Sequence, residues 1–206
     1  MSQFIPNIRK YLHHSEKVGN SPVTEKPNEI HLWDNFRSGE DSAFIKIYET
    51  YFPTLYSYGH QFTNDSDLIK DSIQEFFIEL RNNRNRLGDT TSVKAYFFKS
   101  MRRRLLRALA KKKYLLYDGH LEKDFDFEIT LSWESILINN QIEAEKKNKL
   151  DEAFTKLTKR QKEAIIYFYY EGLSYEEIAS IMNLAKVKYA RTLVYRSIDK
   201  LKEEIY

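Results

Sequence analysis

The chain has 206 residues, a formal net charge of +3, 31% charged and 42% hydrophobic residues, and no cysteine. The length allows one or two domains with real cores, and the lack of cysteine excludes a disulfide framework, a thiolate metal site and a thiolate nucleophile. No apolar run is long enough to span a bilayer, and the N-terminus lacks the apolar core of a signal sequence. We therefore expect a cytoplasmic protein without membrane insertion.

The N-terminal residues 1–28 contain three prolines and a Gly-Asn-Ser cluster but no sustained period, which predicts a mobile arm. His13 and His14 lack a nearby pattern of ligands, so we interpret them as solvated and not as a metal site. Helical periodicity begins at Glu29, and an apolar stripe over residues 38–51 predicts a helix. Pro53 either opens or kinks the helix that follows. The stripe consists of Ala43, Phe44, Ile47, Tyr48 and Tyr51.

A turn and cap signal at Asn64-Asp65-Ser66 predicts a helix over residues 66–82. Its apolar residues recur at helical spacing, and its outward face is largely acidic. Such a face is most often simply solvated. The predicted outward residues are Asp67, Asp71, Gln74 and Glu75.

The following segment is strongly basic. A polar loop with three arginines leads into a predicted helix over residues 92–113, which carries nine basic residues and no acidic one. Charges of one sign at this density repel one another, and a nucleic-acid backbone would relieve the repulsion. Tyr96, Phe97 and Phe98 lie beside the basic residues and could stack on unpaired bases, although for each of them we favour a place in the core.

The charge then reverses over residues 114–142, a weakly periodic and mainly acidic stretch that predicts an extended linker between two helical domains. An amphipathic helix is predicted over 143–157. Thr158 and Gln161 have the spacing of a capping box, which starts a helix that ends near Gly172.

A second capping box, Ser174 and Glu177, predicts a short helix that breaks at Asn183 and is followed by a longer helix. On the longer helix, the apolar positions predicted to face inward are Tyr189, Leu193, Ile198 and Leu201. The basic residues point elsewhere, which matches a helix-turn-helix whose second helix enters the major groove. An ordinary helical hairpin with solvated lysines is the alternative. The basic residues are Lys186, Lys188, Arg191 and Arg196.

Two motifs give the chain a family resemblance. Residues 71–77, Asp-Ser-Ile-Gln-Glu-Phe-Phe, resemble the polymerase-clamp-binding helix of bacterial sigma factors, and residues 157–179 resemble the signature of their second domain. Both occur in the family's order, so the chain resembles the compact two-domain extracytoplasmic-function group of the sigma-70 family. The tail over residues 193–201 is similar to the Bacteroidetes-type members. The sequence departs from the family's usual residues at Arg81, Arg103 and Ala185.

The resemblance implies an all-α fold with an N-terminal region 2-like domain over 29–113 and a C-terminal region 4-like helix-turn-helix domain over 143–206. It implies that the acidic linker runs toward the active-site cleft of the polymerase. It also assigns three sets of residues. Asp67, Asp71, Gln74 and Glu75 would bind core RNA polymerase; Arg84, Arg86, Lys99, Arg102, Arg103 and Arg107 would bind the minus-ten promoter element; Lys186, Lys188, Arg191, Thr192 and Arg196 would bind the minus-thirty-five element.

Other functions have less support in the sequence. There is no glycine-rich phosphate loop, no nucleophile with a matching base and no metal-ligand spacing, so we expect neither an enzyme nor a cofactor or metal. The main alternative is a helix-turn-helix regulator that acts without polymerase. A decoy that sequesters polymerase is a third reading. The sequence leaves open the regulon, the inducing signal and whether an anti-sigma factor is a partner.

Overall fold

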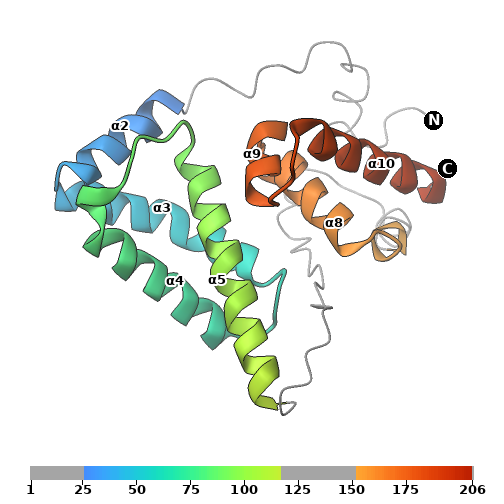
Figure 1. Cartoon of the computed structure of the whole chain (residues 1–206), viewed down its shortest axis with the longest axis horizontal. Helices are drawn as coiled ribbons and strands as arrows, with labels where there is room; N and C mark the ends of the chain where they lie inside the picture. Colours follow the sequence, from blue (N-terminus) through green and yellow to red (C-terminus); the bar gives the residue numbers. More distant parts are fainter. Residues whose placement is uncertain (1–25, 117–151, 206) are drawn as a thin grey trace, which may run out of the picture.

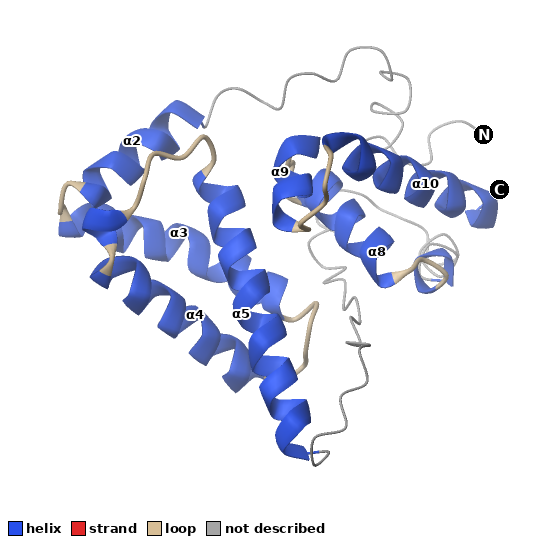
Figure 2. Ribbon diagram, in the orientation of Figure 1, coloured by secondary structure: helices blue, strands red, loops and turns tan. Residues whose placement is uncertain are grey.

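The computed structural model describes residues 26–116 and 152–205, and every regular element in these stretches is a helix (Figure 2). The predicted all-α fold is therefore confirmed. The predicted N-terminal arm and acidic linker lie outside the described residues, except for short overlaps with helices at 26–28 and 114–116. Within the described stretches, no helix has the length and apolar character needed to cross a membrane.

The N-terminal part is a bundle of four helices packed around aromatic side chains (Figure 1). The helix α3 packs against the other three, which join it in one core. The ring of Phe97 on α5 lies at the centre, with centroids 6.0 Å from Trp33 of α2, 4.6 Å from Tyr51 of α3 and 5.1 Å from Phe76 of α4. The four helices are α2 (Lys26–Arg37), α3 (Asp41–Gly59), α4 (Ser66–Asn82) and α5 (Val93–Leu116).

The helix α4 has the predicted limits, and its start has a local cause: the carboxylate of Asp65 accepts a hydrogen bond from the backbone N–H of Leu68 at 3.0 Å. In the helix α3, one of the two predicted roles of Pro53 is wrong. Pro53 lies inside one helix and does not open a new one, because Tyr51 and Leu55 on either side are buried and hold the helix in place. Tyr48, predicted in the apolar stripe, is 39% exposed.

The C-terminal part begins with helical residues 152–155 and continues through three short helical elements to the long helix α10, which packs against α8 and α9. Both predicted capping boxes are present: Thr158 with Gln161, and Ser174 with Glu177. The last turns before residue 171 are a π-helix. The elements are α8 (Lys159–Ile165), η2 (Ile166–Tyr170), α9 (Tyr175–Ile181) and α10 (Val187–Ile205).

Two residues in the left-handed conformation separate these helices, as predicted. Gly172 has φ of 63° and lies between η2 and α9, whereas Asn183 has φ of 51° and lies between α9 and α10. Glycine adopts this conformation at low steric cost, and asparagine tolerates it better than most residues. The turn at Asn183 joins the two helices of the helix-turn-helix, and the turn at Gly172 precedes the first of them.

The predicted inward side of α10 was wrong in the first half of the helix, where the buried positions lie one residue further along the chain than predicted. Tyr189 is 46% exposed and Leu193 is only half-buried, whereas Ala190 and Val194 are fully buried. A small alanine at 190 allows α10 to approach α8 and α9 closely, and a tyrosine there would not fit at the same distance. The predicted inward positions Ile198 and Leu201 are confirmed.

The two parts of the chain lie side by side, with α9 packed against α5 (Figure 1). The buried hydroxyl groups of Tyr58 on α3 and Tyr167 in η2 are hydrogen-bonded to each other across this contact. The N-terminal and C-terminal domains therefore share a packed interface in this arrangement.

Candidate polymerase and DNA interfaces

The recognition helix α10 presents its basic residues to solvent. All five residues predicted for the upstream element are exposed. The guanidinium of Arg191 lies 5.2 Å from the ring centroid of Tyr175, and the ammonium of Lys188 lies 5.4 Å from that of Tyr189. Lys186 lies in the turn before α10, and Arg196 lies further along the helix. The sequence analysis missed Tyr189 as a surface residue, because its hydrophobic ring fitted the wrong apolar stripe.

The helix α4 presents the four predicted polymerase-binding residues on its exposed side. Lys70 lies 4.0 Å from Asp67, and Arg104 lies 3.8 Å from Glu75, so these two carboxylates are partly offset by neighbouring cations. Ile78 is 51% exposed on the same helix. This exposed apolar side chain on the same helix is identified only by the structure.

The basic helix α5 divides its charges between two directions. Arg103 and Arg107 are exposed, and neither has an acidic partner among the described residues. Lys99 and Arg102 instead contact the C-terminal domain: the ammonium of Lys99 donates to the hydroxyl of Ser180 at 3.0 Å, and the guanidinium of Arg102 donates to the Glu163 carboxylate at 2.5 and 3.2 Å. The predicted set is therefore not one continuous surface in this arrangement.

The aromatic residues beside these charges are core residues. Phe97 and Phe98 have no exposed surface, so they cannot stack on unpaired bases while the domain is folded. Tyr96 is half-buried, with its ring 5.5 Å from that of Trp33.

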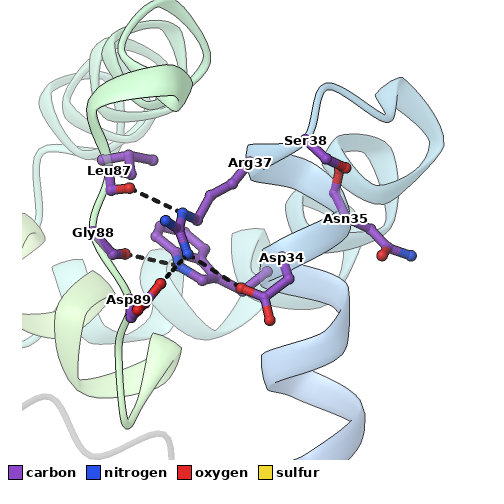
Figure 3. A network of polar contacts seen from close by, with 8 residues as sticks. Asp34, Asn35, Arg37, Ser38, Leu87, Gly88 and Asp89 are labelled. Atoms are coloured by element: carbon purple, nitrogen blue, oxygen red, sulfur yellow. Dashed lines mark hydrogen bonds and ion pairs between the residues drawn. The ribbon is translucent and has the colours of Figure 1, made fainter.

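The loop between α4 and α5 is held by α2. The guanidinium of Arg37 donates to the carbonyl of Leu87 at 2.9 Å and to the carboxylate of Asp89 at 2.5 Å, and the indole of Trp33 donates to the carbonyl of Gly88 at 3.3 Å. Figure 3 shows Arg37 directed at these loop residues. The loop is therefore ordered by a helix that lies more than 45 residues earlier in the chain.

The two predicted loop arginines differ in exposure. Arg86 is exposed, whereas Arg84 is half-buried, 3.5 Å from both the carbonyl of Gly39 and the carboxylate of Asp41. The short 3-10 helix η1 (Arg84–Arg86) carries both. A polar cavity of about 440 Å³ lies next to it. It is lined by Asp41, Arg81, Asn82, Arg84 and Asn85.

A buried polar network joins the domains. The carboxylate of Glu163 accepts from Arg102 and from the hydroxyl of Tyr167 at 2.9 Å, and Tyr167 contacts Tyr58. Burial, together with the charge of Glu163, holds the pKa of both tyrosines well above their usual value. Burial opposes the charged form of Arg102 and is the largest single effect on its pKa, but the hydrogen bond to Glu163 and the charge of Glu163, together with Tyr167 and Tyr58, outweigh burial and raise the Arg102 pKa. Arg102 and Glu163 therefore each have hydrogen-bond partners, which a buried ion pair needs to offset the cost of removing its charges from water.

The two domains match known families in the order predicted. Residues 47–114 match "Sigma-70 region 2", and residues 147–201 match "Sigma-70, region 4". Together these matches cover more than half of the chain.

The chain belongs to the sigma-70 family.

This sigma factor therefore binds core RNA polymerase and directs promoter-specific initiation of transcription, as the sequence analysis predicted. Regions 2 and 4 are the two domains that the sequence motifs predicted for a member of the extracytoplasmic-function group. The Bacteroidetes type that the tail resembles stays a prediction. No curated protein matches the chain significantly.

Two solved structures share the fold of this sigma factor. One is CnrH in complex with the cytosolic domain of CnrY, with a TM-score of 0.56 and 16% sequence identity over 85% of this chain and 95% of the other. The second is the sigma factor RpoE in complex with the anti-sigma factor NepR from Bartonella quintana, with a TM-score of 0.54 and 18% identity over 79% of this chain and 96% of the other. At sequence identities this low, the similarity shows the fold, and no role of a residue is transferred from these structures to this chain.

Proposed function

We propose that the two domains divide promoter recognition between them. The domain over residues 29–113 binds the polymerase clamp and the minus-ten element, and the domain over 143–206 binds the minus-thirty-five element as duplex. The observation that carries this proposal is the separation of charge: the polymerase-facing side of α4 is acidic, whereas the exposed residues of α5 and of the first turns of α10 are basic.

The exposed acidic face of α4 is assigned to the clamp. Asp67, Asp71, Gln74 and Glu75 provide the charge and hydrogen-bond acceptors, and Ile78 adds apolar area to the same surface. The proposed occupant is a basic surface of core polymerase.

The exposed cations of α5 and its loop are assigned to the minus-ten element. Arg86, Arg103 and Arg107 are accessible in the arrangement described, and Arg84 lines the polar cavity at the loop. Arg102 belongs to the same proposed surface and becomes accessible when the C-terminal domain moves away from α5. The same movement releases the exposed ammonium of Lys99 from Ser180.

The accessible side of the recognition helix is assigned to the minus-thirty-five element. Arg191 is the residue proposed to read a base, because arginine binds the edge of guanine through two hydrogen bonds. Lys186 and Lys188 are proposed to supply charge to the phosphates, with Thr192 and Arg196 flanking them.

The function is tested by transcription in vitro with purified core polymerase and a library of genomic fragments. We expect initiation at a small set of fragments that share two separated elements, and little binding to duplex DNA without core. Tight and specific binding of the free protein to duplex DNA, with no effect of core polymerase, would instead support a regulator that acts without polymerase. Binding to core without initiation at any fragment would indicate a decoy.

An anti-sigma partner is also proposed. One of the two solved relatives is bound to an anti-sigma factor, and the other to the cytosolic domain of CnrY. Since core polymerase is a cytoplasmic enzyme, this sigma factor would act there. Co-purification from cells that produce a tagged chain would identify an anti-sigma partner as a protein that is displaced when core polymerase binds.

A further inference from the structure

An aromatic pair lies beside the residue that is proposed to read the upstream element. Tyr175 is the first residue of α9, directly after the cap residue Ser174. Its ring stacks on that of Phe168, with centroids 4.9 Å apart and planes inclined by 13°. The Arg191 guanidinium lies 5.2 Å from the Tyr175 ring centroid. We call Phe168, Tyr175 and Arg191 the aromatic stack.

The ring of Tyr175 is fixed from several sides. The capping box at Ser174 and Glu177 sets the start of α9, and Phe168 sets the plane of the ring. The hydroxyl of Tyr175 interacts with that of Tyr195, which lies one turn beyond Arg191 on α10. Three elements therefore hold this ring, although its side chain is only half-buried.

The guanidinium of Arg191 depends on this ring for its direction. Arg191 is exposed, and within the described residues it has no ion pair with an acidic side chain. Arginine loses much conformational freedom when a ligand fixes its side chain. A flat ring under the guanidinium reduces the number of orientations that it samples before DNA binds, so less freedom is lost on binding. Burial and the contact with Tyr195 raise the pKa of Tyr175 to about 12, so its hydroxyl is neutral at physiological pH.

We propose that Tyr175 is a positioning residue for sequence reading: it orients the guanidinium of Arg191 so that two N–H groups face a guanine edge in the major groove of the upstream element. The inference rests on the proposed role of Arg191. A guanine recognised in this way needs both donors in one plane at a fixed angle, and a guanidinium stacked on a ring meets that requirement without further ordering.

Tyr175 acts through Arg191 and not by its own contact with a base. Its loss should therefore reduce the discrimination between guanine and other bases at one position, and should change the overall affinity for the other upstream sequences little. A cation–π contact at an exposed site is weak, so we expect the preference for guanine to fall by roughly two- to five-fold.

The experiment uses the full chain bound to core polymerase and a selection from duplexes with a randomised upstream element. Four variants are compared with the wild type: Tyr175→Leu, Tyr175→Phe, Arg191→Ala and the double variant Tyr175→Leu with Arg191→Ala. Tyr175→Phe keeps the ring and should retain the preference, and Tyr175→Leu should lose part of it. The double variant should match Arg191→Ala alone, because the ring has no role once the guanidinium is gone.

An unchanged base preference in Tyr175→Leu would overturn the inference, as would a double variant whose loss is the sum of the two single losses. Equal weakening of all upstream sequences by Tyr175→Leu would also overturn it, since that is the behaviour of a phosphate contact. If Arg191→Ala itself keeps the wild-type preference, the proposed base reading by Arg191 fails instead. Where Tyr175→Leu does not fold, as judged by circular dichroism, Tyr175→Met serves as the non-aromatic variant and the same outcomes decide.

Discussion

Gly59 lies near the end of α3, where this helix packs closely against α4. A Cβ atom added there would lie 2.5 Å from Cγ2 of Ile69, a buried residue of α4. No real Cβ atom is this close to a branched core side chain, so α3 and α4 would have to move apart. The glycine is needed for the packing distance, and no unusual backbone conformation is involved.

We expect Gly59→Ala to lower the free energy of unfolding by about 1–3 kcal/mol, because the added methyl group overpacks a dense core. Urea denaturation followed by circular dichroism measures the change. Gly88→Ala is the matched control, since a Cβ at Gly88 meets no atom within 4 Å. Equal midpoints for the two variants would contradict the close approach of α3 to α4.

Tyr58 and Tyr167 make the domain interface sensitive to alkaline pH. Both have a folded-state pKa raised well above the ordinary tyrosine value of about 10, with burial as the largest cause. Because the unfolded or separated chain loses these protons more readily, the stabilisation by the two neutral hydroxyl groups is fully present below about pH 10 and is lost as pH rises toward the raised pKa values.

We therefore expect the interface to open between about pH 10 and the raised pKa values of the pair. Tyrosinate absorbance during an alkaline titration should show two tyrosines that ionise together with a cooperative change in the near-ultraviolet dichroism. The variant Tyr58→Phe with Tyr167→Phe should lack this late step. A wild-type titration in which all tyrosines ionise before any structural change would disprove the assignment.

At the scale of single helices, α4 combines two surfaces with different tasks. Ile73 and Phe77 are buried, so substitutions on that side test the fold, whereas Asp71 and Glu75 are exposed and test only binding. In an amphipathic helix of this kind, the buried side chains stabilise the fold and the exposed side chains are available for binding.

The variant Asp71→Lys with Glu75→Lys should keep the thermal stability of the wild type and bind core polymerase about tenfold more weakly, which is on the order of 1.4 kcal/mol. Its affinity is measured by competition with the wild-type chain for purified core enzyme. Asp199→Lys with Glu203→Lys makes the same change of charge on exposed positions of α10 and serves as the control. Equal affinities for the two variants would remove α4 from the clamp interface.

At the scale of the whole molecule, the contact between the domains covers part of the proposed DNA surface. Lys94 pairs with Glu171 at 2.9 Å, and Lys99 and Arg102 also bond to the C-terminal domain. A buried ion pair such as Arg102 with Glu163 is costly to separate unless new partners replace it, and promoter phosphates are suitable partners for the arginine. We therefore expect the domains to separate when these residues bind the promoter as proposed.

A covalent link between the domains tests this expectation. The chain has no cysteine, so Lys99→Cys with Ser180→Cys creates one reactive pair at positions whose native side chains are 3.0 Å apart. Linked by a short bis-maleimide, this variant should lose most of its open-complex formation in permanganate footprinting. The same variant treated with a mono-maleimide is the control for the substitutions themselves. Equal open-complex formation in both samples would show that the domains need not separate.

The sequence by itself determined the features that depend on neighbouring residues. The limits of α4, both capping boxes and the left-handed turns at Gly172 and Asn183 follow from bonds that span three or four residues, so local patterns are sufficient to predict them. The order of the two domains and their acidic and basic segments could also be predicted from the sequence, and the two motifs in this order indicated the correct family.

Only the tertiary structure decided which face of a helix is buried and which charges meet. On α10 the apolar and aromatic positions form a stripe wide enough to face inward in more than one way, and the space beside α8 and α9 selects Ala190 and Val194 in place of Tyr189. The partner of Arg102 lies 61 residues away in another domain. Periodicity describes one helix at a time, and the position of the second helix against it depends on packing and on long-range electrostatic contacts that no local pattern contains.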